Sequence, residues 1–85
     1  MGEVIGAWLR QRRGMNDWSQ EQLAERLELS DSTVSRIERG VLTPDGRMAR
    51  RIVRALGVPV TEILAAAACD LARDYLAGDE DEQQP

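Results

Sequence analysis

The stretch from Ser19 to Gly40 constrains the fold more than any other part of the sequence, because it holds two helix starts with almost nothing between them. Ser19, followed three residues later by Gln22, forms a capping box that predicts the start of one helix. Ser30 is a second N-cap signal, and only two residues separate it from Leu27, the last apolar residue of the first helix. Two helices joined by so short a connection must meet at a steep angle.

A close crossing of these two helices requires a small residue on the first and apolar side chains on one face of the second. Ala24 meets the first requirement, and Val34 and Ile37 meet the second because residues three apart share a helix face. Gly40 is expected to end the second helix, since glycine readily adopts the left-handed conformation found there. The opposite face of the second helix is either merely exposed to solvent or a binding surface. It carries Ser32, Thr33, Ser35, Arg36 and Arg39.

The rest of the chain predicts three more helices and no strand. One covers about residues 3–13, the fourth runs from an N-cap at Thr43 with Pro44 in its first turn to Leu56, and the fifth covers about 60–77. The spacing of apolar residues places a common set in the core: Trp18, Leu23, Leu27, Val34, Ile37, Ile52 and Leu56.

Charge is divided unevenly along the chain, whose net charge is −4. Ten arginines face seven acids between Arg10 and Arg54, whereas residues 55–85 hold one arginine and seven acids. The net charge alone argues against a polyanionic partner, but the positive charge between Arg10 and Arg54 is compatible with one. Every cation is arginine, which suits contacts to phosphate and guanine, although a compositional bias explains most of the missing lysine.

Several classes of protein fit this composition poorly. There is no histidine, and one cysteine cannot form a disulfide within the chain, which favours a reducing, cytoplasmic location. We find no metal-binding cluster, no glycine-rich phosphate loop and no nucleophile beside a base, so neither an enzyme nor a cofactor is expected. The longest apolar run, ILAAAAC, is far too short to cross a membrane, and the N-terminal residues lack a signal-peptide core.

The segment SQEQLAERLELSDSTVSRIERG resembles the helix-turn-helix of the Cro/C1-type (Xre) family of phage and bacterial repressors, and the resemblance covers about residues 5–64. It implies an all-α, five-helix, lambda-repressor-like domain over 1–64 that acts as a sequence-specific transcriptional regulator, here a repressor. Its recognition helix, about 31–39, would lie in the major groove of double-stranded DNA.

The resemblance also implies roles for individual residues. Arg36 is the strongest base reader, because a guanidinium can bond guanine O6 and N7 together. Asp31 either accepts from cytosine or caps its helix, and the cap is favoured because phosphates repel a carboxylate. A solvated role remains open for each arginine taken alone. The implied base readers are Asp31, Ser32, Ser35 and Arg36; the implied phosphate contacts are Gln20, Thr33, Arg39, Arg47 and Arg50; and Arg13 and Glu38 would form a structural salt bridge.

The sequence departs from the family pattern at four places, among them Glu28 and Gly46. Glu28 stands where the turn between the two motif helices usually has glycine, so a left-handed conformation there would cost about 1 kcal/mol. Gly46 replaces an expected apolar residue in the fourth helix.

The fifth helix is longer than the core fold requires. Leu64, Ala68, Leu71 and Tyr75 repeat at the spacing of a coiled-coil seam. Either this helix packs on its own core or its later part, 65–77, forms a homodimer interface, which we favour beyond residue 66. Residues 78–85 predict an acidic, disordered tail. The tail and the long helix also support an alternative function, an adaptor or antitoxin-like module that binds a protein partner through the C-terminal helix.

Overall fold

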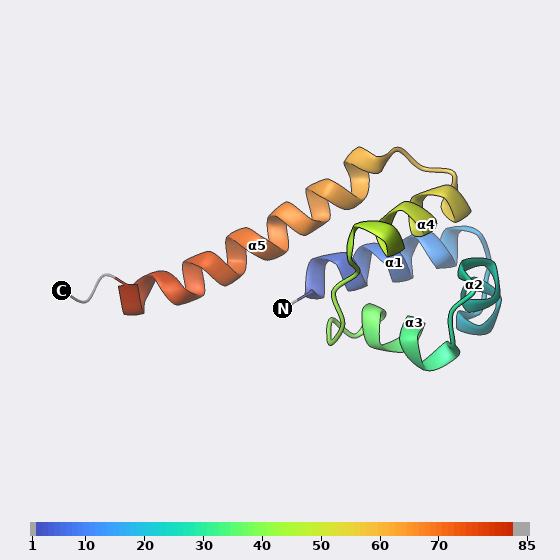
Figure 1. Cartoon of the computed structure of the whole chain (residues 1–85), viewed down its shortest axis with the longest axis horizontal. Helices are drawn as coiled ribbons and strands as arrows, with labels where there is room; N and C mark the ends of the chain where they lie inside the picture. The colour runs from blue at the N-terminus through green and yellow to red at the C-terminus, as the bar shows by residue number, and fades with distance from the viewer. Residues whose placement is uncertain (1, 83–85) are drawn as a thin grey trace.

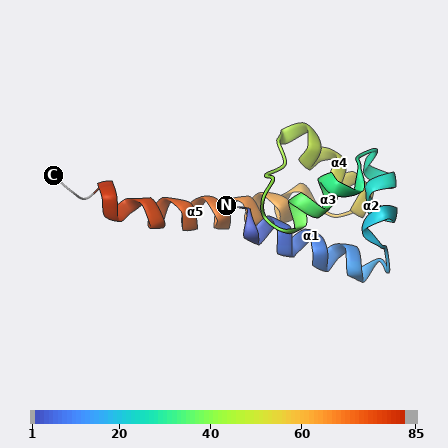
Figure 2. The ribbon, with the colours of Figure 1, turned by 90° about the horizontal axis from the view of Figure 1, so that it is seen from below.

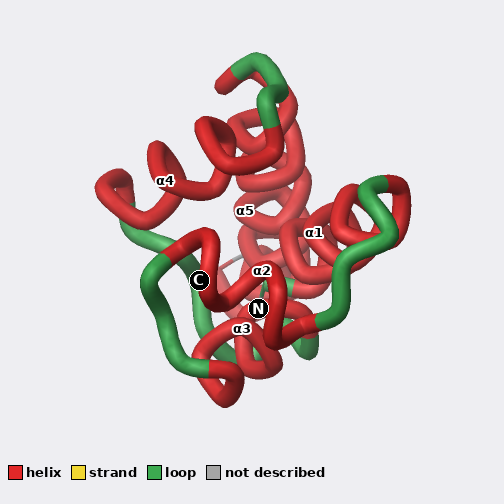
Figure 3. Tube along the Cα trace, turned by 90° about the vertical axis from the view of Figure 1, so that its right-hand side faces the viewer, coloured by secondary structure: helices red, strands yellow, loops and turns green. Residues whose placement is uncertain are grey.

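The computed structural model describes residues 2–82, and this range is helical without a strand, as the sequence predicts (Figures 1 and 3). The five helices are α1 (Glu3–Met15), α2 (Gln20–Leu27), α3 (Asp31–Glu38), α4 (Gly46–Leu56) and α5 (Val60–Glu82).

Four short helices and the first part of α5 surround one apolar core. Helix α1 packs against α5 and α3, α2 packs against α3 and α4, and α4 packs against α5. The second half of α5 projects from this body as a single helix, which both views make plain (Figures 1 and 2). The buried apolar residues are Ile5, Leu9, Leu23, Ala24, Leu27, Val34, Ile37, Ile52, Val53, Ile63 and Ala66.

Two residues that the spacing placed in the core are only half-buried. Leu56 packs against the edge of the core from the last turn of α4. Trp18 does the same from the loop before α2, and the guanidinium of Arg26 stacks over its outer face at 4.3 Å from the ring centroid. Trp18 therefore lies between Arg26 and the edge of the apolar core and does not fill the centre of the core.

The helix starts of the motif form as predicted, but that of α4 differs. Ser19 and Gln22 complete the capping box, and the Ser30 hydroxyl accepts the Thr33 amide hydrogen at 3.2 Å. The N-cap of α4 is Asp45, which accepts the amide hydrogen of Met48 at 2.8 Å, so the predicted cap at Thr43 is wrong. Aspartate is a better N-cap than threonine, and its charge also suits the helix dipole.

Glu28 adopts the left-handed conformation that the sequence suggested would be costly. Its φ and ψ are 57° and 41°, and it ends α2 with the amide of Leu29 donating to the Ala24 carbonyl. A residue with a Cβ atom pays a steric penalty in this region, whereas glycine does not. The turn from α2 into α3 therefore carries local backbone strain at Glu28.

We expect Glu28→Gly to raise the free energy of unfolding by up to about 1 kcal/mol, because it removes this strain. Glu25→Gly is the matched control, since it places glycine inside α2 and should lower stability by about 1 kcal/mol. Denaturant unfolding of both variants measures the difference. Equal destabilisation by the two glycines would contradict the strain at Glu28.

Helix α1 approaches the end of α3 so closely that only glycine fits at the contact. A Cβ atom built on Gly6 would lie 2.5 Å from the carbonyl oxygen of Glu38 and 2.6 Å from that of Ile37. Both obstacles are backbone atoms, so no side-chain rotation can relieve them. Gly6 therefore sets the distance between α1 and α3, a role that the sequence pattern did not reveal.

Helix α5 is joined to α1 by polar contacts that the sequence pattern did not reveal. The carboxylate of Asp70, which is 5% exposed, accepts the amide hydrogens of Val4 at 2.8 Å and Ile5 at 2.9 Å. It serves as an N-cap supplied by another helix, where the α1 cap residue Gly2 has no side chain to offer. The body therefore holds α5 up to Asp70, one turn beyond residue 66.

A second polar contact ties the first turn of α5 to α1. Glu62 accepts a hydrogen bond from the indole of Trp8 at 3.1 Å and forms an ion pair with Arg12. The bond from Trp8 and the charge of Arg12 lower the pKa of Glu62. Together with Asp70, this contact fixes the direction in which α5 leaves the body.

The end of α5 also differs from the prediction. The helix continues to Glu82, whereas the sequence predicted an end near Ala77 and a disordered tail from residue 78. Glutamate favours helix, and the single Gly78 opposes it by only about 1 kcal/mol. The last three residues of the predicted tail, 83–85, lie outside the described residues.

Candidate nucleic-acid interface

Helix α3 is held by one face and presents the other to solvent. Val34 and Ile37 are completely buried, and Ala24 is buried in the adjoining helix α2, as expected for a close crossing. Figure 3 shows α3 at the edge of the molecule, joined to α2 by a short loop. The outward face carries the residues implied to read bases, of which Asp31, Ser32 and Arg36 are exposed and Ser35 is half-buried.

A cluster of hydroxyl groups marks the start of α3. The Ser30 hydroxyl lies 2.8 Å from that of Thr33 and 3.2 Å from that of Ser32. Ser30, not Asp31, provides the side-chain cap of the helix. Asp31 lies in the first turn, where its charge suits the dipole, so the cap favoured for it in the sequence analysis belongs to its neighbour.

The two arginines of this surface have no acidic partner in the part of the chain described. Arg36 is exposed, and its Nε lies 3.4 Å from the Ser32 carbonyl, which leaves the outer nitrogens of the guanidinium free. Arg39 is exposed at the C-cap of the same helix. Both side chains can therefore turn toward an anionic or hydrogen-bonding ligand without first breaking an ion pair.

The buried carboxylate of Glu38 connects α1, α2 and α3 behind the outward face of α3. Glu38, which is 3% exposed, accepts from Arg13 Nε at 2.6 Å and from Arg13 Nη2 at 3.1 Å. This pair is the salt bridge that the resemblance implies, and its hydrogen bond raises the pKa of Arg13. Arg13 also donates to the Trp18 carbonyl at 2.9 Å, and Arg10 donates to the Glu38 carbonyl at 3.2 Å.

The same carboxylate fixes the first residue of α2. Gln20 donates from Nε2 to Glu38 Oε1 at 3.0 Å. One hydrogen of the Gln20 amide is thus occupied, and the second remains available to a phosphate oxygen at the exposed start of the helix. Sequence spacing gave no sign that Gln20 and the salt bridge share one network, because residues 13, 20 and 38 lie on three different helices.

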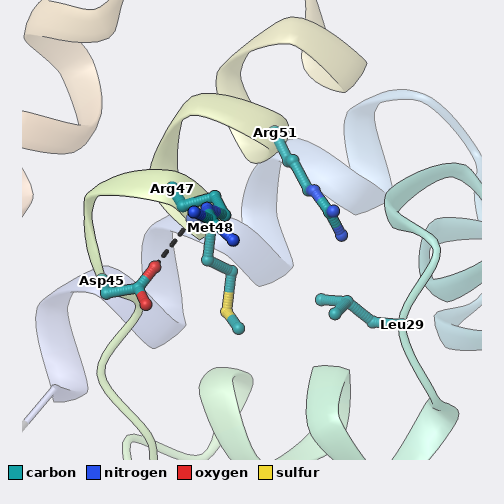
Figure 4. Close-up of a pocket in the computed structure, with 5 residues that line it drawn as sticks. All are labelled: Leu29, Asp45, Arg47, Met48 and Arg51. Atoms are coloured by element: carbon teal, nitrogen blue, oxygen red, sulfur yellow. Dashed lines mark hydrogen bonds between the residues drawn. The ribbon is translucent and has the colours of Figure 1, made fainter.

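Helix α4 adds arginines near the turn between α2 and α3. Arg47, Arg50, Arg51 and Arg54 are exposed and follow each other at helical spacing along one side of α4. A hollow of about 110 Å³ lies between the start of α4 and the α2–α3 turn (Figure 4). Its lining residues are Leu29, Asp45, Arg47, Met48 and Arg51.

Arg51 was not among the residues implied by the family resemblance. Its Nη1 donates to the carbonyl of Leu27 at 3.3 Å, so it binds the end of α2 just before the steep turn. Figure 4 shows its side chain extending from α4 toward the segment that carries Leu29. Arg51 thus supports the turn, whereas Arg47 and Arg50 have no ion pair among the described residues.

The residues of the expected seam on α5 lie on its surface. Leu64, Leu71 and Tyr75 are each more than half exposed in the single chain, and Ala68 is exposed as well. We call these four residues the α5 seam. Cys69 is exposed beside the seam. No helix within residues 2–82 is both long and apolar enough to cross a lipid bilayer.

Most of the chain outside the projecting half of α5 matches a known protein family. A model of a helix-turn-helix family matches residues 9–63, which include all of α2, α3 and α4. No curated protein matches the sequence.

Solved structures show the same fold. A structure of ClgR, the clp gene regulator of Corynebacterium glutamicum, is 30% identical with a TM-score of 0.71, covering 81% of this chain and 90% of that one. A second ClgR structure is 28% identical with a TM-score of 0.72, covering 95% of this chain and 86% of that one. The hypothetical transcription factor NHTF from Neisseria is 30% identical with a TM-score of 0.70, covering 74% of this chain and 71% of that one.

Proposed function

The chain belongs to the Cro/C1-type family of helix-turn-helix proteins, and on that premise we propose that it is a DNA-binding transcriptional regulator. Its α3 enters the major groove and presents Ser32, Ser35 and Arg36 to base edges. The similar structures include a gene regulator and a hypothetical transcription factor. The observation that carries the proposal is the outward face of α3, where hydroxyls and arginines without an acidic partner among the described residues lie opposite a fully buried apolar face.

Contacts to the DNA backbone come from residues around this face. Gln20 and Thr33 approach phosphates from the starts of α2 and α3, while Arg39, Arg47 and Arg50 add positive charge. Asp31 lies among them as a carboxylate that phosphates repel, so its contribution is to accept from a cytosine amino group or to stabilise the helix start. Because the whole chain is acidic, binding should be modest and sensitive to salt.

We expect Arg36→Ala to lose about 1–3 kcal/mol of discrimination at one G·C position, because the paired bonds to guanine disappear. Selection of binding sites from random duplexes by the wild type and the variant measures this. Arg54→Ala is the matched control, since it removes an exposed arginine on the far turn of α4 and should leave the selected sequence unchanged. An identical motif at identical strength for Arg36→Ala would contradict the assignment.

The regulator acts as a homodimer that presents two copies of α3 to an operator with two-fold symmetry. The α5 seam is the apolar surface on which the two chains meet, because the body covers so little of it. A repressor is the simplest form of regulation by such a dimer, since occupation of the operator requires no further surface. Its place of action is then the cytoplasm, where bacterial DNA is found.

We expect Leu71→Asp to produce a folded monomer that binds a symmetric operator much more weakly, because a buried unpaired carboxylate would oppose pairing in each chain. Sedimentation and circular dichroism on wild type and variant measure association and helical content. A wild type that is monomeric at micromolar concentration, or a variant that remains dimeric, would overturn the proposed dimer.

An adaptor or antitoxin-like module is the alternative function, and the exposed seam on the projecting helix is the observation in its favour. Such a module would use α5 to bind a different protein and would not need the α3 surface. A salt-dependent mobility shift with promoter fragments separates the two functions, because only the regulator retains DNA.

A further inference from the structure

An apolar hollow lies between the start of α4 and the middle of α5. Its volume is about 190 Å³, and Ile5 and Ile63 form part of its wall. Gly46, Ala49 and Ala67 also line it, and these small residues leave the space open. A Cβ atom built on Gly46 would meet nothing within 4 Å. We call this space the Gly46 hollow.

The Gly46 hollow and the α5 seam form one surface. Leu64 belongs to both. A second hollow of about 220 Å³ continues along α5 and shares Ile5 and Ala67 with the first, and its outer wall includes Leu71 of the seam. The two hollows and the seam therefore present apolar side chains continuously along one side of α5.

We propose that the Gly46 hollow receives Tyr75 of a second copy of the chain, so that the two α5 helices pair antiparallel. This inference rests on the proposed homodimer and deepens it by naming the register and the contact. In an antiparallel pair centred on the seam, Tyr75 of one copy lies opposite Leu64 of the other, which is the residue that leads into the hollow.

The chemistry of the hollow suits a tyrosine. Tyr75 is 62% exposed in the single chain, so its ring has no adequate cover. An apolar cavity of about 150 Å³ can hold benzene, so the Gly46 hollow has room for a phenol ring. A buried tyrosine hydroxyl needs a hydrogen-bond partner, and Asp45 at the rim uses Oδ1 for its helix cap and retains Oδ2 as an acceptor.

Charge favours the antiparallel orientation. Residues 79–82 are all acidic, and a parallel pair would place two such ends side by side. An antiparallel pair instead carries each acidic end toward the body of the other copy. That body carries the exposed arginines of α4, of which Arg47 and Arg50 have no ion pair among the described residues.

Sedimentation of the full-length chain over a range of concentrations tests the contact. We expect Gly46→Leu, which fills the hollow, and Tyr75→Ala, which removes its occupant, each to weaken dimerisation about tenfold or more. The double variant should be no weaker than either single variant, because both remove the same contact. Gly46→Ala and Leu76→Ala are the controls, since the first leaves most of the hollow open and the second removes an exposed side chain outside the seam.

Cross-linking tests the orientation independently of affinity. In a Cys69→Ala background, one preparation carries Gly46→Cys and a second, with a different tag, carries Tyr75→Cys. We expect a short bifunctional thiol reagent to join the two preparations when mixed, and to join neither preparation to itself. Efficient self-linking of the Tyr75→Cys chain would indicate parallel pairing and overturn the inference.

The remaining outcomes are also decisive. A dimer that keeps its full strength in Gly46→Leu overturns the hollow as a contact, and a monomeric wild type overturns the inference together with the dimer. Neither result touches the DNA-binding role of α3, which is tested by Arg36→Ala. Unfolding curves verify that Gly46→Leu remains folded, as the open space around Gly46 leads us to expect.

Discussion

Replacing Arg13 with alanine is expected to lower the free energy of unfolding by about 3–5 kcal/mol, the largest effect of any single substitution considered for this chain. The substitution leaves the carboxylate of Glu38 buried with only the amide of Gln20 as a side-chain partner. It also removes the donor to the Trp18 carbonyl in the loop before α2. Chemical denaturation followed by circular dichroism measures the loss.

The buried charge, rather than the lost packing, causes this effect. The double variant Arg13→Met with Glu38→Leu removes both charges and keeps similar volume, so we expect it to recover most of the stability of the wild type. Gln20 should then lose its fixed orientation, and binding to all DNA sequences should weaken together. If the double variant were as unstable as Arg13→Ala, lost packing rather than the buried charge would account for the loss of stability.

Gly6→Ala is expected to have the second-largest effect, a loss of about 1–3 kcal/mol or more. The added methyl group meets two backbone carbonyl oxygens of α3, so α1 and α3 must separate. Because α1 supports the end of α3, the proposed recognition helix, DNA affinity should fall more than the loss of stability alone explains.

Gly14→Ala is the matched control on the same helix. A Cβ atom at this position meets nothing within 4 Å, so alanine should raise stability by about 0.5–1 kcal/mol through its better helix propensity. Thermal unfolding of the two variants gives opposite shifts on our account. A Gly6→Ala protein as stable as Gly14→Ala would contradict the close approach of α1 to α3.

Features that depend on nearby residues could be predicted from the sequence. The capping box at Ser19, the N-cap at Ser30, the left-handed Gly40 and the burial of Ala24 in α2 all follow from spacings of a few residues. At α4 two local signals competed, and the stronger N-cap, Asp45, prevailed over Thr43.

Features that join distant parts of the chain could not be predicted. Asp70 caps a helix 65 residues earlier, and its sequence neighbours gave no sign of this role. The bond from Arg51 to the Leu27 carbonyl and the crowding around Gly6 likewise depend on how helices pack. Family resemblance supplied the Arg13–Glu38 pair, which spacing alone does not reveal.

Selection of binding sites from random duplex DNA by the purified full-length protein tests the central claim most directly. We predict enrichment of an inverted repeat whose half-sites are about one helical turn apart, about 34–36 Å, with a G·C pair at a fixed position in each half-site. Retention of these sequences should fall steeply with rising salt. A selected pool indistinguishable from the starting pool would contradict the account of α3 as a recognition helix.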